Sequence, residues 1–266
     1  MFSLAVNHAD LRKSLARVFA VLVLLAATWT LKLYYDATKN PWRSIAAGYG
    51  ENQHEYTPPF NSSDKVIVIA KTQREDTNWV ADYLPDWQRA IYVVDDPAAE
   101  FHTPVNKGRE AMPYLTYIID NYDSLPRTIV FLHSHRNGWW TAWHNDAPYH
   151  DNVIALRNLR LDYVESSGYV NLRCSWSPGC EAVQLKNQHI TPAVWKEFFQ
   201  TDEAPPQVGS ACCAQFAVSR EQILKRPIGD YQRYRQWVFD SPLNDAKSGR
   251  VMEYMWHVIF GKDAVE

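Results

Sequence analysis

Residues 126–136 read Pro-Arg-Thr-Ile-Val-Phe-Leu-His-Ser-His-Arg, and this stretch decides the fold. The β-branched and aromatic run from Thr128 to Leu132 is typical of a buried strand, and two histidines, His133 and His135, follow it. Side chains alternate along a strand, so the two imidazoles are predicted to share one face. Because open α/β sheets build their sites at the carboxyl ends of strands, we expect the chemistry of the protein there.

Similar short apolar runs lie upstream of this strand, and a helical pattern follows each of them. Strands are predicted over residues 66–70 and 90–94, with helices over 78–84 and 110–122. This alternation of strands and helices is characteristic of a mostly parallel sheet flanked by helices. Downstream, the patterns predict helices over 151–165, 191–200, 220–225 and 249–260, and strands over 170–173 and 211–218.

The first 36 residues differ from the rest of the chain. Basic residues precede an apolar run over residues 18–31, which is short beside the about 20 residues of a membrane span. An uncleaved single-pass anchor over residues 14–35 is favoured over a cleaved signal peptide or a soluble helix. Residues 37–63 are predicted to form a polar stalk, and residues 64–266 a single α/β catalytic domain.

The charges that flank the apolar run bear on localisation. They favour a cytosolic N-terminus and a body in the lumen of the endoplasmic reticulum, the Golgi or another endomembrane, but basic residues also follow the run, so the side of the body stays open. The net charge of −3 excludes a large basic field for non-specific nucleic-acid binding. A nucleic-acid substrate would therefore need a local basic patch.

Four cysteines are present, at positions 174, 180, 212 and 213. Their spacing is irregular and does not match that of a zinc site. Cys174 and Cys180 flank a short segment with Pro and Gly, which is compatible either with a small disulfide loop or with free thiols in a reducing compartment.

Acidic residues close the second predicted strand. Asp95 and Asp96 stand at its end, and Glu100 follows shortly after. Two interpretations are open. The carboxylates form an acidic pocket that holds a guanidinium in a forked ion pair, or they belong to a solvated Asp-Pro turn. If they form a pocket, we expect the aspartates and the two histidines to share one cleft at the edge of the sheet.

Further polar candidates lie at the ends of predicted elements. Asn106, Arg109 and Glu110 surround a glycine before a helix, where Arg109 suits a phosphate or carboxylate and a carboxylate is favoured by the helix dipole. Arg136 and His144 follow the His-Ser-His strand.

Glu253 and His257 lie four residues apart on the last predicted helix and hence on one face. They either approach the edge of the sheet or form a helix-packing pair. His133 and His135 are the candidates for acid–base catalysis, because the ordinary pKa of an imidazole lies near neutrality.

Several of these stretches resemble nucleotide-sugar glycosyltransferases of the GT-A type. Ile91-Tyr92-Val93-Val94-Asp95-Asp96 is similar to the end of the second strand in those enzymes, where paired aspartates lie beside the nucleotide. The following strand of that family ends in Asp-x-Asp, which holds a divalent metal, whereas this chain has His133-Ser134-His135. Imidazoles suit softer metals than magnesium or manganese. The resemblance implies a GT-A-like fold.

A closer resemblance covers residues 64–262 and is to a fungal family of unknown function, related to the arginine-containing cyclodipeptide synthases. The shared blocks are those at residues 92–96, 106–111, 114–122, 131–136, 168–174 and 253–257. Those enzymes join arginine to a second amino acid, both taken from aminoacyl-tRNA, as a cyclic dipeptide. Their Asp-Asp-x-x-Glu motif is one residue longer here, over residues 95–100.

This resemblance implies a tRNA-dependent transferase of secondary-metabolite biosynthesis. Its partners would be arginyl-tRNA and a second charged tRNA, without a cofactor and without a stable protein partner. The implied catalytic residues are Asp95, Asp96, Glu100, His133 and His135. The implied substrate-binding residues are Asn106, Arg109, Glu110, Arg136, His144, Glu253 and His257.

Two other functions compete with this one. The first is a membrane-anchored glycosyltransferase of the Golgi type, for which alone a divalent metal is expected. A body in the lumen favours it, because charged tRNA is absent there. The second is a binding protein with a GT-A-like fold and no catalytic activity.

Overall fold

The computed structural model describes residues 8–39, 64–138, 143–177, 182–184 and 189–266. The chain divides into two units, residues 1–56 and 57–266. The first contains helix α1 (His8–Lys39), which includes the residues predicted as a membrane anchor. Among the helices in the described ranges, none is long and apolar enough to cross a membrane.

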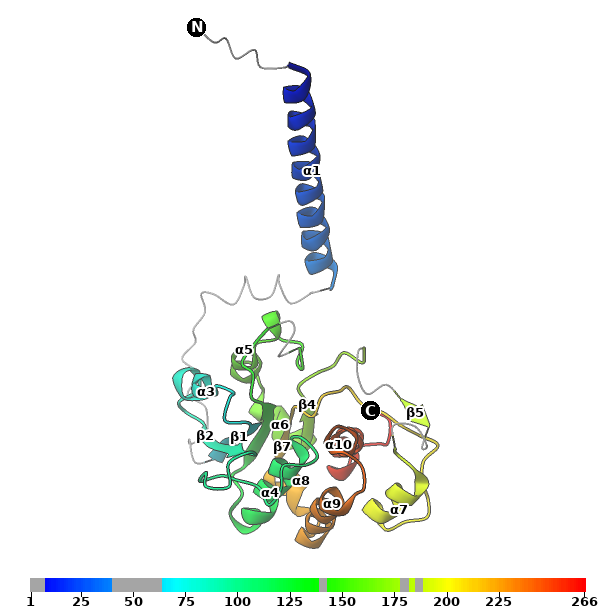
Figure 1. The fold of residues 1–266 in the computed structure, drawn as a ribbon. Helices are drawn as coiled ribbons and strands as arrows, with labels where there is room; N and C mark the ends of the chain where they lie inside the picture. Colours follow the sequence, from blue (N-terminus) through cyan, green and yellow to red (C-terminus); the bar gives the residue numbers. More distant parts are fainter. Residues whose placement is uncertain (1–7, 40–63, 139–142, 178–181, 185–188) are drawn as a thin grey trace. The chain divides into compact units, whose positions relative to one another are not determined.

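A five-stranded mixed sheet forms the centre of the second unit (Figure 1). Its order is β2 (Gln88–Val93), β1 (Lys65–Lys71), β3 (Thr128–His133), β7 (Phe216–Ser219), β4 (Tyr169–Asn171). Strand β1 is parallel to β2 and β3, whereas β7 is antiparallel to both β3 and β4. The carboxyl ends of β1, β2, β3 and β4 therefore lie at the same edge of the sheet as the first residue of β7.

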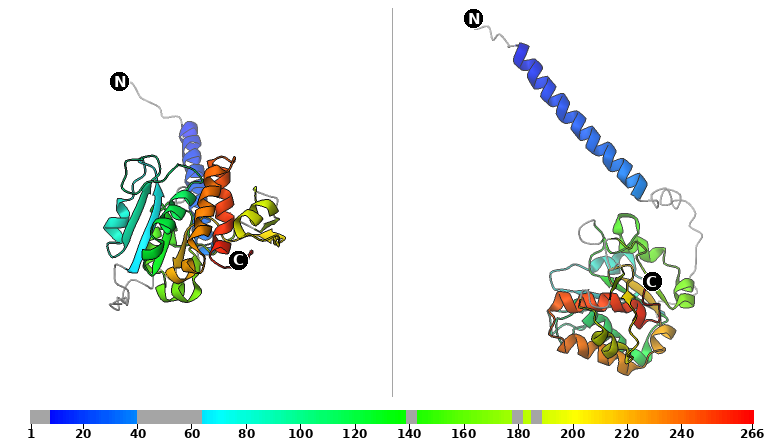
Figure 2. Two further views of the ribbon diagram at one scale, coloured as in Figure 1. Left: turned by 90° about the horizontal axis from the view of Figure 1, so that it is seen from below. Right: turned by 90° about the vertical axis from the view of Figure 1, so that its right-hand side faces the viewer.

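Helices cover both faces of this sheet (Figure 2). One apolar cluster includes α4 (Ala111–Asp120), α9 (Ile228–Asp240) and α10 (Asp245–Ile259). The other includes α3 (Asn78–Tyr83), α5 (Asn152–Arg157) and α6 (Leu161–Ser167). Strand β3 is buried between them, because Ile129 and Phe131 belong to the first cluster and Val130 and Leu132 to the second.

Shorter elements complete the domain. They are η2 (Tyr122–Ser124), η3 (Pro148–His150), α7 (Pro192–Phe199), α8 (Arg220–Leu224) and a two-stranded sheet of β5 (Val183–Gln184) and β6 (Gln207–Val208). Two predicted helix starts are confirmed by their caps. The hydroxyl of Thr191 accepts a hydrogen bond from the N–H of Val194, and that of Ser219 from the N–H of Gln222.

An aromatic cluster joins the sheet to α4 and α10. Phe216 lies at its centre and is completely buried. Its ring centroid lies 5.0–6.0 Å from the centroids of five other rings, those of Tyr114, Phe131, Tyr169, Trp256 and Phe260. Tilted and edge-on ring pairs at these distances are favourable beyond the area that they bury. This packing holds α10 against the strands.

The structure corrects several predicted elements. The strand predicted over 211–218 begins only at Phe216, because Cys213 and Ala214 have φ values of 128° and 54°, outside the strand region. The helix predicted over 151–165 is two helices, α5 and α6. The last helix begins at Asp245 rather than 249, because the side chain of Asn244 caps it. The predicted mostly parallel sheet is confirmed, with β7 as its antiparallel strand.

Candidate functional site

A cavity of about 290 Å³ opens where β3 ends. Five segments of the sequence line it. Strand β3 provides His133, the turn before α4 provides Arg109 and Glu110, and the loop after β3 provides Trp143 and His144. The turn before β7 provides two cysteines, and α10 provides Arg250, Glu253 and Tyr254. Its volume lies near the lower end of small-molecule sites, which occupy about 300–1,000 Å³.

His133 is the last residue of β3, and its two ring nitrogens have different surroundings. The ring makes a hydrogen bond to the backbone of Cys213. Its Nε2 atom is buried and has no hydrogen-bond partner in the described part of the chain. The carbonyl of Cys213 therefore holds the proton on Nδ1, and Nε2 presents a lone pair. Burial and the neighbouring His144 lower the pKa of His133 to about 3, so this imidazole is neutral at pH 7.

His144 lies beside His133 in the same cavity, with 4.3 Å between the ring centroids. Its Nδ1 is also buried without a partner among the residues that the structure describes. Burial, followed by the charges of His135 and Arg173, lowers the pKa of His144 to about 4. The cavity thus contains two neutral imidazoles, each with one ring nitrogen that no described residue hydrogen-bonds.

Two carboxylates from different helices line the cavity. Glu110 precedes α4 directly, and Glu253 lies on α10, where its Oε2 is 2.7 Å from Nη1 of Arg250. Glu110 borders the cavity, but the protein encloses its carboxylate. This burial is the largest cause of its raised pKa of about 8, and the charge of Glu253 contributes to the same increase. At pH 7 Glu110 therefore retains its proton, and a cation entering the cavity would favour its ionisation.

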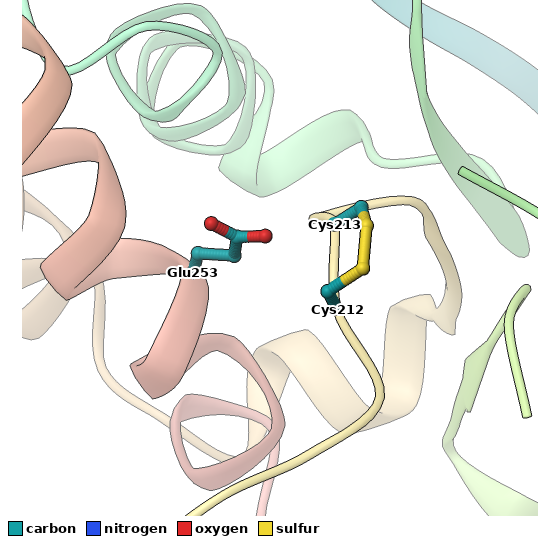
Figure 3. Close-up of side chains that lie close together, drawn as sticks. All are labelled: Cys212, Cys213 and Glu253. Carbon is teal, nitrogen blue, oxygen red and sulfur yellow. A yellow bond between two sulfur atoms is a disulfide. The ribbon is translucent and has the colours of Figure 1, made fainter. Parts of the chain in front are cut away.

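The sequence analysis assigned no function to Cys212 and Cys213. They precede β7, are buried, and are joined by a disulfide (Figure 3). The carboxylate of Glu253 points toward this disulfide from α10, and the ligand atoms of the three residues lie within 4.8 Å of one another (Figure 3). Of the other two cysteines, Cys174 is an exposed free thiol, and Cys180 lies outside the described residues.

The cavity brings together Arg109, Glu110, His133, His144 and Glu253, which the sequence analysis had placed in one site. It does not include the paired aspartates. They follow β2, which is separated from β3 by β1. The expected cleft shared by the aspartates and the histidines is therefore not this cavity.

The contacts of the acidic group are those of a turn. Asp95 accepts a hydrogen bond from the N–H of Gln73 at 2.8 Å, and Asp96 accepts one from the N–H of Ala98 at 3.0 Å. The latter is the side-chain pattern of an Asp-initiated turn. Glu100 lines a different cavity, of about 440 Å³, together with Arg235.

The remaining candidates have other contacts. Strand β3 ends at His133, so the alternation does not continue to His135, whose Nε2 lies 3.5 Å from a carboxylate oxygen of Glu75. Arg136 pairs with Asp151 at 3.2 Å and lies over the ring of Tyr83. Glu253 and His257, the predicted pair on the last helix, have different surroundings. Glu253 lines the cavity, whereas Nε2 of His257 lies 3.0 Å from the carbonyl oxygen of Ala264. Asn106 is exposed.

A family model described as "Protein of unknown function (DUF3431)" matches residues 67–266. The chain belongs to the DUF3431 family. The match includes every residue that lines the cavity. Neither a curated protein nor a solved structure matches the chain.

A buried amide network positions His133 in this DUF3431 domain. The β3–β7 pairing ends at Phe131 and Phe216, so the N–H of His133 donates instead to Oε1 of Gln215, at 2.9 Å. Gln215 is completely buried, and its Nε2 donates to Oδ1 of Asn152 at 3.2 Å. Asn152 in turn donates to the carbonyl of His135 at 2.9 Å. One side chain thus replaces the missing ladder bond.

The Gln215→Leu variant is expected to lower the free energy of unfolding by about 2–3 kcal/mol, because unsatisfied buried polar groups cost about 1–3 kcal/mol each. The N–H of His133 and the amide of Asn152 would each lose a partner. Urea denaturation followed by circular dichroism measures the change. Gln232 is exposed on α9, so Gln232→Leu should stay within about 0.5 kcal/mol of wild type. Equal decreases in the free energy of unfolding of the two variants would show that the hydrogen bonds of Gln215 do not stabilise the fold.

Proposed function

We propose that this DUF3431 protein is a transferase that joins an arginyl group, delivered as an aminoacyl-tRNA ester, to a second aminoacyl group. The cavity beside His133 is its active site. One observation supports this proposal above the others: the cavity contains a neutral imidazole, whose Nε2 has no partner among the described residues, together with two carboxylates, Glu110 and Glu253. The imidazole can move a proton, and the carboxylates can hold a cationic side chain.

The reaction requires a proton acceptor and a proton donor. The α-amine of one aminoacyl group attacks the ester carbonyl of the other, and the ribose oxygen leaves. His133 accepts the proton of the amine on Nε2, because its Nδ1 proton is held by the carbonyl of Cys213. It returns that proton to the leaving oxygen. The free α-amine of the dipeptidyl ester then attacks the remaining ester carbonyl with the same proton transfers, which closes the ring and releases the second ribose oxygen. The imidazolium formed in between is stabilised by the carboxylate of Glu253 in the same cavity.

The carboxylates suit the guanidinium of the arginyl group. A guanidinium presents its N–H groups in a planar fork that matches a carboxylate. The negative charge of Glu253 contributes to the raised pKa of Glu110, because the two carboxylates repel each other. A cation bound between them would remove this repulsion. This proposal places the guanidinium site away from Asp95 and Asp96, where one of the two interpretations of the acidic group had placed it.

We also propose a GT-A-like relationship for the fold. It is supported by the parallel arrangement of β2, β1 and β3 and by the cavity at their carboxyl edge. His133 stands where that family has the first residue of its metal-binding Asp-x-Asp. A glycosyltransferase and a binding protein without activity are the alternatives that the following experiment separates.

The proposed reaction is tested with the purified full-length chain, arginyl-tRNA and a mixture of other charged tRNAs. A cyclic dipeptide that contains arginine is the expected product, detected by mass spectrometry. The same preparation is supplied with nucleotide sugars and sugar acceptors. Transfer of a sugar without formation of a dipeptide would establish the glycosyltransferase instead, and no product in either assay would favour the binding protein.

The guanidinium site is tested by calorimetry with two ligands of similar shape. N-acetylargininamide is cationic, and N-acetylcitrullinamide is neutral. The cationic ligand should bind at least about tenfold more tightly, a difference of about 1.4 kcal/mol. Glu110→Gln and Glu253→Gln should each reduce this preference, while Glu203→Gln, at an exposed position outside the cavity, should preserve it. Equal affinity of wild type for both ligands would refute the assignment.

A further inference from the structure

The sulfur atoms of Cys212 and Cys213 have no part in the proposed transfer, yet both residues line the same cavity. The two side chains are 1% and 5% exposed. A buried disulfide between neighbouring residues closes no long loop, so the loop-entropy stabilisation of an ordinary disulfide is small here. The position of the pair, beside Glu253 and the two histidines, indicates a role in the chemistry of the cavity.

The donor atoms around this pair are those of a metal site. The ligand atoms of Cys212, Cys213 and Glu253 lie within 4.8 Å of one another. His133 and His144 also line the cavity, and their Nε2 and Nδ1 atoms, respectively, are buried without hydrogen-bond partners in the described ranges of the chain. The second nitrogen of the His133 ring bonds to a backbone carbonyl, which is the usual support of a histidine that binds a metal.

We propose that the reduced Cys212–Cys213 pair binds a divalent zinc-like ion together with Glu253 and a ring nitrogen of the neighbouring histidines. Zinc takes four ligands from thiolate, imidazole and carboxylate groups in tetrahedral geometry. Two thiolates make the site soft, so it should prefer zinc over magnesium or calcium. Figure 3 shows the carboxylate of Glu253 directed at the two sulfur atoms, as binding of a shared ion requires.

Binding of the ion requires prior reduction of the disulfide. A dithiol reductant transfers two electrons and two protons to the S–S bond, which yields two thiols and leaves the reductant as its own disulfide. The ion then displaces both thiol protons and binds two thiolates. In a tetrahedral zinc site the two sulfurs lie about 3.8 Å apart, so opening the S–S bond is a geometric requirement as well. The disulfide form of the protein is therefore expected not to bind the ion at this site.

Metal binding would also regulate the proposed transfer. Glu253 is proposed to hold the guanidinium, so an ion on this carboxylate competes with the arginyl group for it. This consequence rests on the proposed function, whereas binding of the ion does not. The oxidised protein is then the form that accepts substrate, and the reduced protein in the presence of zinc is blocked.

The test uses the full-length chain in two states, as the disulfide and after reduction with a phosphine that is then removed without air. Calorimetry with Zn²⁺ and absorbance with Co²⁺, which reports thiolate ligands, measure stoichiometry and affinity. The reduced chain should bind one ion per molecule, at least about a hundredfold more tightly than the disulfide form. Equal affinity of the two states, or no binding by the reduced chain, would overturn the proposal.

Variants identify the ligands. Cys212→Ser/Cys213→Ser should lose binding by at least about a hundredfold, while Cys174→Ser/Cys180→Ser, which removes the other two cysteines of the chain, should retain it. Circular dichroism checks the fold of each variant. Glu253→Gln keeps all four thiols and should weaken binding by about tenfold or more, so the site remains testable if the first variant does not fold. Full binding by Glu253→Gln, or loss in the control variant, would refute the assigned ligands.

Competition then examines the regulatory step. Zinc should weaken the binding of N-acetylargininamide to the reduced chain and leave its binding to the disulfide form unchanged. If zinc binds to the reduced chain and the affinity for N-acetylargininamide does not change, the metal site stands, but Glu253 is not shared between the ion and the guanidinium. Zinc binding together with a failed dipeptide assay would separate the metal site from the proposed function.

Discussion

Replacement of His133 by alanine is expected to lower the rate of dipeptide formation by about 10²–10⁴-fold, the usual contribution of a general base. The variant removes the only group to which we assign both proton transfers. Because burial holds the pKa of His133 near 3, its Nε2 lone pair is available throughout the neutral range, and alanine offers no substitute. The initial rate of product formation by mass spectrometry, with wild type under the same conditions, measures the effect.

The control for this variant is His102→Ala. His102 is exposed and does not line the cavity beside His133, so its replacement should leave the rate unchanged. Thermal unfolding of both variants separates loss of catalysis from loss of fold. A His133→Ala protein that is folded and still forms product at the wild-type rate would show that the proton transfers take place elsewhere.

Replacement of Phe216 by alanine is expected to lower the free energy of unfolding by about 3–5 kcal/mol, as for other buried aromatic side chains. Phe216 packs against five aromatic rings, which belong to the sheet, to α4, to α10 and to Phe260 directly after α10. Its replacement by alanine therefore leaves a void that borders several elements. Domains are commonly stable by only about 5–15 kcal/mol, so this loss is large. Urea denaturation provides the measurement.

A matched variant exists on α9. Phe239 is 49% exposed, and Phe239→Ala should change the free energy of unfolding by no more than about 0.5 kcal/mol. If Phe216→Ala lost no more than this control, the aromatic cluster would not be the link between sheet and helices that the ring distances indicate.

Local signals in the sequence predicted much of the fold. The apolar run before His133 lies where the structure has β3, and the helices predicted over 191–200 and 220–225 correspond to α7 and α8. Helix α9 was missed, although its buried side chains at Tyr231, Tyr234, Trp237 and Val238 recur at helical spacing.

The site depends on pairings that no local pattern reveals. His133 was found because a strand ends there, and Glu253 because it lies on a recognisable helix. The turn at Cys212 and Cys213 faces these two residues because β7 pairs beside β3, although residues 134–215 separate the two strands in the sequence. Asp95 and Asp96 were expected to share a cleft with His133, but β1 separates their strand from β3, and no local signal in the sequence reveals this order.

The place of β7 has a consequence for synthesis on the ribosome. Residues up to 133 complete β1, β2 and β3, but the second neighbour of β3 is residues 216–219, which emerge much later. Until then the nascent chain exposes an apolar strand edge, of the kind that pairs with other chains. Polypeptides that are released before residue 216 should therefore depend on chaperones and aggregate readily, whereas those that end just after α10 should not.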